Sequence, residues 1–427
     1  MTLTSAITRK GRWICLLSSV ALAASSAAPA LAQDIRGQSV RDRLPPEFSK
    51  PPIIVGGFEV RPLIETELEY IDNIFASSTN PQDDLVISVL PSVEVRDRRD
   101  DREISLRARA GGEAYLNGTL PALFVLSSRG IARLRLGSPT RPFGGFGIDL
   151  NGSQLRGVDS DDFRFIAQPV RLANYRFNAG VEQDIGRFTV TGEGRANLVR
   201  YSGSLNLDGT EFDSGFRDYN AYVGQVDFSY TDLADQRIYA SASFNRREYG
   251  SADPTSLITA FSRDRSSDGY TIEAGYSRWL TDLFYVDARV GYLEQNYDDL
   301  TIASQSGLSL NAVGRYSPTA LTTFTATARR TIDQTANPLF SGLLRTEFSL
   351  RADHELRRFL LVYADARYGR IDRGDLVEGS DEYNISAGLE YRVSPSWSLT
   401  GRAERYQRFG SFEFEQNRLV VGAEYRF

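Results

Sequence analysis

The sequence predicts an all-β fold, a closed antiparallel transmembrane β-barrel of the outer-membrane type with about eighteen strands. Three observations predict it. From Phe58 to Phe427, segments of about 10–14 residues alternate apolar with polar side chains, which is the period of strands with two different faces. The connections between these segments alternate between short and long. An apolar stretch with the features of an export signal precedes them.

The composition excludes several other classes of protein. The chain has 427 residues, of which 41% are hydrophobic and 24% charged, with a formal net charge of −6 and a single cysteine. A disulfide scaffold needs more cysteines, and this acidic chain is unsuited to nucleic acid, so we expect no nucleic-acid partner. Length alone would allow two or three soluble domains, but the uniform alternation favours one large sheet.

Residues 1–32 have the features of a secretory signal peptide. Arg9, Lys10 and Arg12 precede an apolar stretch, and Ala30-Leu31-Ala32 is a small-x-small cleavage site. Cleavage after this site would remove the only Cys, the only Met and three basic residues. The mature chain would then hold 46 basic against 55 acidic residues, a formal charge of −9. We therefore expect an exported chain without cysteine.

Two further regions follow the expected signal peptide. Residues 33–57 are proline-rich, and because proline excludes regular helix we expect an extended periplasmic lead there. Residues 58–427 form the expected barrel. The last strand shows the alternation most clearly, since Leu419 and every second residue to Phe427 are apolar or aromatic. Between 117 and 170 the alternation is patchy, which leaves sixteen strands as the alternative count.

The spacing of turn residues supports the count of eighteen. Short turns are expected at 98–101, 138–139, 184–186, 231–235, 281–282, 317–318, 356–358 and 394–395. Longer polar loops are expected at 157–167, 202–217, 250–268, 331–342 and 371–382. Eight short turns pair sixteen strands, and the first and last strands add one each. Short turns at one end and long loops at the other are typical of outer-membrane barrels, with both termini in the periplasm.

Alternation alone does not separate a membrane barrel from a soluble sandwich. Many of the expected strands exceed the usual length of about 5–6 residues in soluble sheets. Aromatic residues also gather near strand ends on the apolar face, as in the girdles at membrane interfaces. They are Tyr175, Tyr270, Tyr276, Tyr292, Tyr316, Tyr368 and Tyr383. These features favour the membrane barrel.

The polar faces of the expected strands carry both charges, and they are the candidate lining of the lumen. The residues are Arg107, Arg109, Glu113, Glu193, Arg195, Asp287, Arg289, Arg345, Glu347, Arg351, Asp365, Arg367, Arg402, Glu404 and Glu424. Cross-strand ion pairs would brace such a wall, and about eighteen strands leave an aqueous lumen. Tyrosines on the same faces would suit stacking on sugar rings; they are Tyr115, Tyr201, Tyr239, Tyr285, Tyr363 and Tyr406. The simpler interpretation is that the charges only solvate and brace the wall.

The sequence offers little for catalysis. The sole histidine, His354, falls on the apolar face beside a short turn, where a structural role is favoured over a catalytic one. No His/Cys cluster or phosphate-binding loop is present, so we expect no enzyme, cofactor or metal. The acidic runs 159–162 and 298–299 are best interpreted as solvated loops, with a divalent cation as the alternative. The partly apolar segment 250–268 is a surface loop or, alternatively, a constriction inside the lumen.

The start and end of the barrel region resemble a known family. Phe58 to Ile64, Leu68 to Phe75 and the segment around Pro91 resemble the opening strands of the type 2 outer-membrane β-barrel porins of Proteobacteria. Tyr425 and Phe427 resemble the signal by which such barrels are recognised for assembly. The resemblance implies an outer-membrane channel, and for some members of the family a role in exopolysaccharide export.

We therefore expect a channel in the outer membrane of a Gram-negative bacterium that passes polar or anionic solutes, with exopolysaccharide export as a further role implied by the resemblance. The alternative is a structural or adhesive barrel with a plugged lumen. Expected partners are outer-membrane lipid and lipopolysaccharide, the barrel-assembly machinery acting on the C-terminal strand, and periplasmic polysaccharide-export proteins. We expect the assembly signal to be Tyr425 and Phe427.

Overall fold

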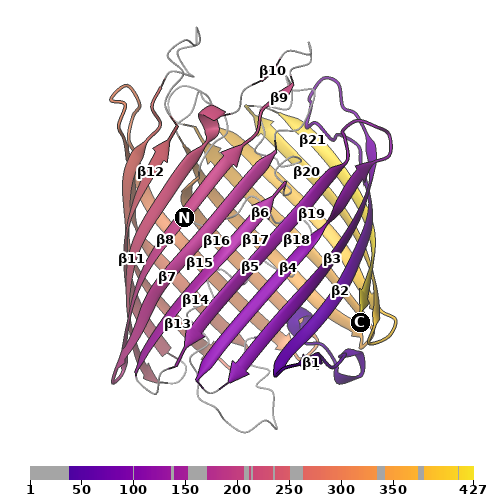
Figure 1. Ribbon diagram of the computed structural model, residues 1–427, viewed down its shortest axis with the longest axis horizontal. Coiled ribbons are helices and arrows are strands. Elements are labelled where there is room, and N and C mark those ends of the chain that lie inside the picture. Colours follow the sequence, from indigo (N-terminus) through magenta and orange to yellow (C-terminus); the bar gives the residue numbers. More distant parts are fainter. Residues whose placement is uncertain are drawn as a thin grey trace.

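The computed structural model describes residues 38–427 except 100, 136–138, 152–170, 206–210, 213–214, 234–235, 251–262, 334–341, 374–378 and 412. Within this part of the chain, eighteen long strands form one closed antiparallel barrel (Figure 1). They are β2 (Phe58–Ile71), β3 (Asp84–Arg99), β4 (Arg102–Tyr115), β5 (Leu123–Leu134), β6 (Thr140–Leu150), β7 (Leu172–Ile185), β8 (Phe188–Tyr201), β11 (Tyr219–Leu233), β12 (Gln236–Tyr249), β13 (Ser267–Thr281), β14 (Phe284–Tyr297), β15 (Gln305–Thr319), β16 (Thr322–Asp333), β17 (Leu343–Arg357), β18 (Leu360–Asp372), β19 (Ser380–Arg392), β20 (Trp397–Gly410) and β21 (Phe414–Arg426). The predicted fold and strand number are confirmed.

The barrel closes between its first and last long strands. β2 pairs with β21 from Leu63 opposite Arg426 to Ile71 opposite Arg418, and it pairs with β3 on its other edge. Closure leaves no free sheet edge along the wall, which is the condition for a sheet to cross a membrane. No helix among the described residues is long and apolar enough to cross a membrane.

Short elements flank the barrel strands. β1 (Ile53–Val55) pairs with the start of β2, and β9 (Ser204–Leu205) pairs with β10 (Glu211–Phe212) in the connection between β8 and β11. Three short 3-10 helices are η3 (Val40–Asp42), η4 (Pro46–Phe48) and η6 (Gly215–Arg217). The lead predicted to be an extended linker therefore contains two helical turns and a strand.

Most turns lie where the sequence predicted them, but the one predicted at 317–318 was wrong. β15 continues through Ser317 and Pro318, and the chain turns only after Thr319. The strand register shifts between Tyr316 and Thr319. Proline lacks the N–H that a regular ladder requires, so it sits at this irregularity without ending the strand.

Three of the long loops are shorter than predicted, and in 250–268 the last two residues, Ser267 and Asp268, belong to β13. Thr331–Asp333 complete β16, and 371–372 and 380–382 belong to β18 and β19. Polar residues near a strand end do not mark a loop in a barrel whose inner face is polar. The patchy region 117–170 contributes one hairpin, β5 and β6. The predicted loop 157–167 lies outside the described residues, and so does most of 250–268.

The two faces of the wall differ as the alternation predicts. On β17, Phe348 and Leu350 are 46% and 55% exposed, whereas Asp353 on the opposite face is 2% exposed. The exposed face is the lipid side of a membrane barrel, and the other lines the lumen. Aromatic rings on the outer face form contacts near the strand ends, for example between Trp397 and Tyr425 with centroids 4.8 Å apart.

Candidate functional site

The lumen wall carries all fifteen residues that the sequence singled out. Strand register places them on the face opposite the exposed apolar side chains, on β4, β8, β14, β17, β18, β20 and β21. They are Arg107, Arg109, Glu113, Glu193, Arg195, Asp287, Arg289, Arg345, Glu347, Arg351, Asp365, Arg367, Arg402, Glu404 and Glu424. Their shared face follows from the period-2 geometry of each strand.

Most of these charges are neutralised within the wall. Ion pairs join Arg345 to Glu382 and Arg351 to Asp353, each at 2.8 Å, and Arg109 to Glu65 at 3.1 Å. Further pairs are Arg402–Glu404 (3.2 Å), Arg367–Glu347 (3.7 Å) and Arg195–Glu193 (3.9 Å). Arg345–Glu382 and Arg109–Glu65 each reach across one intervening strand, Arg367–Glu347 joins two adjacent strands, and the other three pairs lie along a single strand. Pairs of the first two kinds brace the wall.

An acidic row on β2 was missed by the sequence analysis. Glu65, Glu67 and Glu69 occupy successive inner-face positions, and Glu67 and Glu69 are buried. Glu65 lies directly opposite Glu424 of β21. The signal was present, because glutamate recurs at every second residue from 65 to 69 within an alternating segment. The row supplies carboxylates for pairing within the wall, as Glu65 does with Arg109 at 3.1 Å.

A basic row lies close by on β4 to β7. Arg107 is directly opposite Arg129, Arg129 is opposite Gly147, and Gly147 is opposite Arg176. Strand spacing places Arg129 about 5 Å from the backbone of β4 and Arg176 about 10 Å from β5. Because Gly147 has no side chain, the guanidinium of Arg176 extends over it, with Nε 3.0 Å from where a Cβ would stand.

Arg129 is the least compensated member of this row. Arg107 donates to Glu94 at 2.8 Å, and Arg176 donates to Asp149. Arg129 is exposed on the inner face and forms no hydrogen bond or ion pair among the described residues. The row therefore presents an uncompensated positive charge to the lumen. Sequence analysis missed Arg129 because it lies in the patchy region 117–170.

Most of the tyrosines predicted to stack on sugars have rings that are already buried or covered by other side chains of the protein. Three of the six are buried, with exposed fractions of 6–7% for Tyr115, Tyr239 and Tyr406. The ring of Tyr239 lies over Gly275 of the next strand, and its hydroxyl donates to Asp287. The ring of Tyr363 is covered by the guanidinium of Arg351, 4.1 Å from its centroid. These four rings are not available as a sugar platform, so that prediction was wrong for them.

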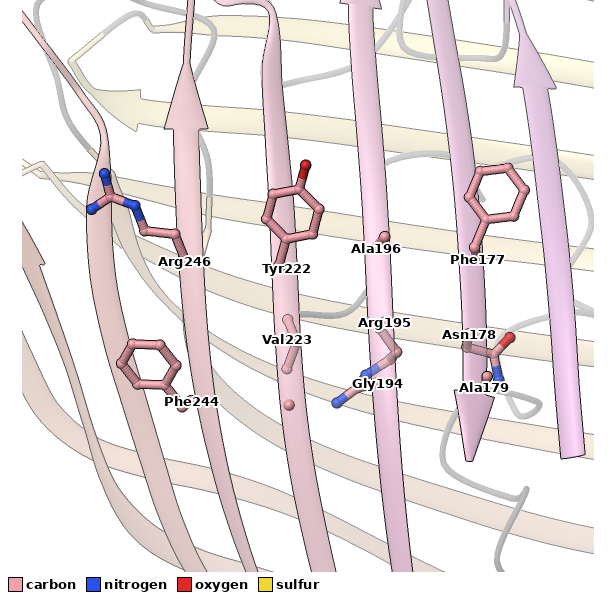
Figure 2. A pocket seen from close by; sticks show the side chains of 11 residues that line it. Phe177, Asn178, Ala179, Gly194, Arg195, Ala196, Tyr222, Val223, Phe244 and Arg246 are labelled. Carbon is pink, nitrogen blue, oxygen red and sulfur yellow. The ribbon is translucent and has the colours of Figure 1, made fainter. Parts of the chain in front are cut away.

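A pocket of about 510 Å³ opens on the outer side of the wall across β7, β8, β11 and β12 (Figure 2). Its floor is formed by small residues such as Gly194 and Gly224, and Phe177, Tyr222 and Phe244 stand around it. The aromatic side chains are among the exposed apolar residues of the lipid face. The pocket is therefore a hollow in the lipid-facing surface and does not belong to the lumen.

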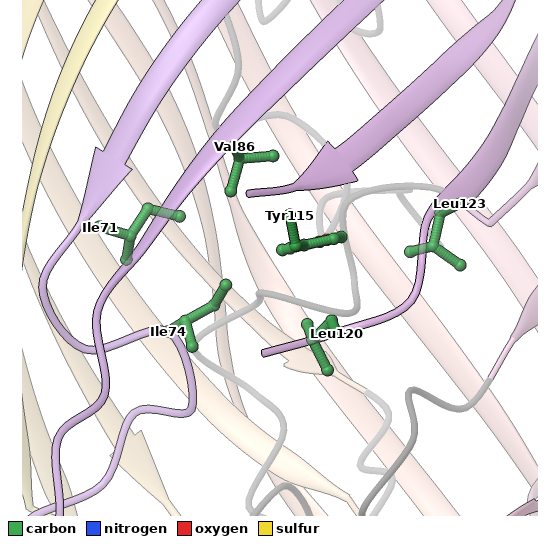
Figure 3. Close-up of a cluster of buried hydrophobic side chains, with 6 residues drawn as sticks. All are labelled: Ile71, Ile74, Val86, Tyr115, Leu120 and Leu123. Atoms are coloured by element: carbon green, nitrogen blue, oxygen red, sulfur yellow. The ribbon is translucent and has the colours of Figure 1, made fainter. Parts of the chain in front are cut away.

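Apolar residues cover part of the inner wall at the end of the barrel that carries the β2–β3 and β4–β5 loops. Ile71, Val86, Tyr115 and Leu123 lie on the inner faces of β2 to β5, and Ile74 and Leu120 of the connecting loops pack against them (Figure 3). The Asp84 carboxylate holds the second loop by accepting hydrogen bonds from the backbone N–H groups of Asn117 (2.9 Å) and Thr119 (3.2 Å). These two loops thus bend inward at this mouth of the barrel, which on the sequence prediction is the extracellular one.

The candidate residues for catalysis and for metal binding lie in surroundings that support a structural role. His354 lies on the outer face of β17, as predicted, with Nδ1 2.9 Å from Thr322 Oγ1. Among the described residues, no group of three or more His, Cys, Asp or Glu side chains is arranged to hold a metal ion. Asp298 accepts a bidentate hydrogen bond from Arg246, which lowers the pKa of this loop carboxyl. The acidic run 159–162 lies outside the described residues.

One family model matches most of this chain. The family model described as "Putative beta-barrel porin 2" matches residues 46–427. A comparison with curated proteins finds no match.

Solved structures with similarity to this chain include the following three. OccAB3 of Acinetobacter baumannii is 13% identical with a TM-score of 0.45, and the match covers 86% of this chain and 99% of that one. OpdK of Pseudomonas aeruginosa is 11% identical with a TM-score of 0.46 and the same coverage. A BenF-like porin of Pseudomonas fluorescens is 10% identical with a TM-score of 0.48, covering 88% of this chain and 100% of that one.

Proposed function

Because this chain belongs to the type 2 β-barrel porin family of the outer membrane, we propose that its lumen passes polar solutes and favours anionic ones. The family and the fold point to a channel rather than an enzyme. A closed sheet of eighteen strands encloses a lumen too wide for its own side chains to fill. Its inner wall is polar and charged, as in barrels with an aqueous channel.

The uncompensated Arg129 supports the preference for anions. Its neighbours Arg107 and Arg176 are each paired with a carboxylate, which leaves Arg129 as the member of the row without one. Guanidinium groups bind carboxylates and phosphates through paired hydrogen bonds. A solute with such a group would gain attraction at Arg129 without first displacing a partner of the protein.

Conductance of the purified mature chain in planar lipid bilayers tests the proposal. Under a salt gradient, the reversal potential should show a preference for anions. Arg129→Glu should lower the ratio of anion to cation permeability about two- to five-fold, the size expected for one charge in a wet lumen. Arg405→Glu makes the same change on the outer face and should leave the ratio unaltered. A wild-type chain that never conducts would refute the open channel and favour the structural or adhesive barrel.

Export of an exopolysaccharide is the alternative cargo, supported by the resemblance to family members linked to glycan export. The burial of Tyr115, Tyr239 and Tyr406 leaves few aromatic platforms for a sugar chain. Loss of secreted glycan on deletion of the gene, together with conductance that is silent without periplasmic export proteins, would favour this cargo over diffusing solutes.

We also propose how the chain reaches its membrane. Residues 1–32 would direct export and be removed, and the C-terminal strand with Tyr425 and Phe427 would be recognised by the barrel-assembly machinery of a Gram-negative bacterium. Lipid and lipopolysaccharide would then surround the exposed apolar face. The mass of the mature chain, measured on protein purified from outer membranes, tests the cleavage after Ala32.

A further inference from the structure

The lead lies on the lumen side of the wall at the periplasmic end. The backbone N–H of Val40 donates to Thr323 Oγ1 at 3.2 Å, and Ser39 Oγ donates to Asp353 Oδ2 at 3.5 Å. Thr323 and Asp353 face each other on the inner faces of β16 and β17. Val40 is only 1% exposed and none of the other three exceeds 7%. The start of the described chain is therefore packed against the inner wall.

From there the lead follows the rim across three successive periplasmic turns. At each turn, a charged side chain of the lead forms a hydrogen bond with a residue of the turn. The contacts are Arg43 Nη1 to the carbonyl oxygen of Ala320 (3.0 Å), Arg358 Nη1 to Glu47 Oε1 (3.1 Å), and Lys50 Nζ to Ser396 Oγ (2.9 Å). Lys50 also donates to the carbonyl oxygen of Arg426 at 2.9 Å. Residues 38–50 are thus fixed along the rim from β15 to β21, as the indigo segment in Figure 1 indicates.

The lead also changes the charge of the mouth. The guanidinium of Arg41 lies 5.7 Å from the ring centroid of Tyr363, which is on the inner face. The guanidinium of Arg351 lies 4.1 Å from the same centroid. A cation over an aromatic face is held there by the ring quadrupole. Arg41 therefore adds a positive charge to the lumen wall that no barrel strand supplies.

We propose that residues 38–50 form a strap that narrows the periplasmic mouth and thereby sets the conductance of the channel. A chain layered on a sheet takes about 10 Å from the width beside it. Contacts at the inner wall and at three turns hold the strap at the mouth. A linker without such contacts would be mobile and would spend most of its time in the periplasm. The proposal rests on the proposed function, because its main readout is current through the same lumen.

Cross-linking tests the position of the strap independently of any current. The mature chain is expected to lack cysteine, so the pair Val40→Cys and Thr323→Cys can be introduced alone. We expect an intramolecular disulfide to form in membranes under mild oxidation. The pair Val40→Cys and Asn311→Cys, with its second position on the inner face in the middle of β15, should not cross-link. Equal cross-linking of both pairs, or of neither, would overturn the assigned position.

Conductance of the mature chain without residues 38–49 tests the narrowing. We expect the single-channel conductance to rise roughly 1.5-fold or more, because one layer of chain leaves the mouth. Val40→Glu, which places a carboxylate at a position that is only 1% exposed, should release the strap with all of its residues present and also raise conductance. The oxidised Val40→Cys, Thr323→Cys channel should keep the wild-type value.

The outcomes separate this inference from the proposed function. A conducting wild type whose current is the same in the deletion and in Val40→Glu would overturn the strap and leave the channel intact. A silent wild type that conducts after deletion would support a strap that closes the mouth completely. Silence in every variant, with the disulfide formed as expected, would refute the channel while confirming where the lead lies.

Discussion

Arg107 of β4 and Arg129 of β5 stand directly opposite each other on the inner wall. Like charges in such a cross-strand pair destabilise a sheet by about 0.2–1 kcal/mol. Arg129→Gln should therefore leave the free energy of unfolding unchanged or raise it by up to about this amount, while the anion preference falls. Urea unfolding of the barrel in lipid vesicles, followed by tryptophan fluorescence, measures the first effect.

The matched control is Arg176→Gln, in the same row. It removes the partner of Asp149 and leaves a carboxylate of the wall uncompensated. We expect this variant to be less stable than wild type by about 1–3 kcal/mol. If Arg129→Gln proves equally destabilising, then Arg129 has a structural partner and the basic row is ordinary bracing of the wall.

The ring of Tyr239 occupies the space that a side chain at Gly275 would need. A Cβ at Gly275 would stand 2.1 Å from Tyr239 Cε2, so Gly275→Ala must displace the ring and its hydrogen bond to Asp287. We expect a loss of about 1–3 kcal/mol, the usual cost of overpacking. Gly224→Ala is the control, because a Cβ there meets nothing within 4 Å. Comparable unfolding curves for the two variants would show that the ring does not depend on the glycine.

The alternation in the sequence was sufficient to predict the wall. A strand turns successive side chains to opposite faces, so the register within one strand follows from its own residues. That is why the faces of Arg351 and Asp365, and even of His354, could be predicted without knowing their neighbours. The strand number also followed from local signals, namely the turn residues, although Pro318 was mistaken for one.

Relationships between strands could not be predicted in this way. Whether the ring of Tyr239 meets a glycine or the lumen depends on which residue of β13 stands beside it. The pairing of Arg107 with Arg129 depends in the same way on the register of a hairpin in the patchy region. The contact of Val40 with Thr323 joins positions 283 residues apart, and the composition of the lead indicated only that it would not be helical.

The contact of Glu47 with Arg358 makes one anchor of the strap sensitive to acid. A hydrogen bond from its own backbone N–H, and then the Arg358 guanidinium, hold the pKa of Glu47 below its ordinary value of 4.5. A carboxyl group whose pKa is lower in the bound state stabilises that state when the pH is above the ordinary pKa. This contribution is lost as the pH falls through the lowered pKa. The anchor is therefore complete at neutral pH and weakens only in acid.

The rate of labelling of an introduced Val40→Cys thiol at each pH measures this dependence. A pyridyl disulfide is the suitable reagent, because it labels thiols in acid as well as near neutrality. Labelling should be constant near neutrality and increase below the ordinary pKa of Glu47. Glu47→Gln should label at neutral pH about as fast as wild type does in acid. A flat profile in wild type would show that the other anchors hold the strap without this ion pair.

The C-terminal aromatic residues provide the last prediction. The ring of Tyr425 packs between Trp397 and Phe427, with both centroid distances 4.8 Å, and Lys50 Nζ lies 5.7 Å from its centroid. Phe427 is 45% exposed, so it adds one aromatic contact to the folded barrel, worth about 0.5–1.5 kcal/mol. Phe427→Ala should therefore lower the free energy of unfolding of refolded protein only slightly, yet sharply reduce the amount of barrel assembled in cells.

Phe409→Ala is the control for this prediction. Phe409 is also on the outer face, is 42% exposed and has its ring centroid 5.8 Å from that of Tyr383, but it stands at the extracellular end of β20. Equal cellular yields of the two variants would show that the C-terminal residue acts only through packing and is not read by an assembly partner.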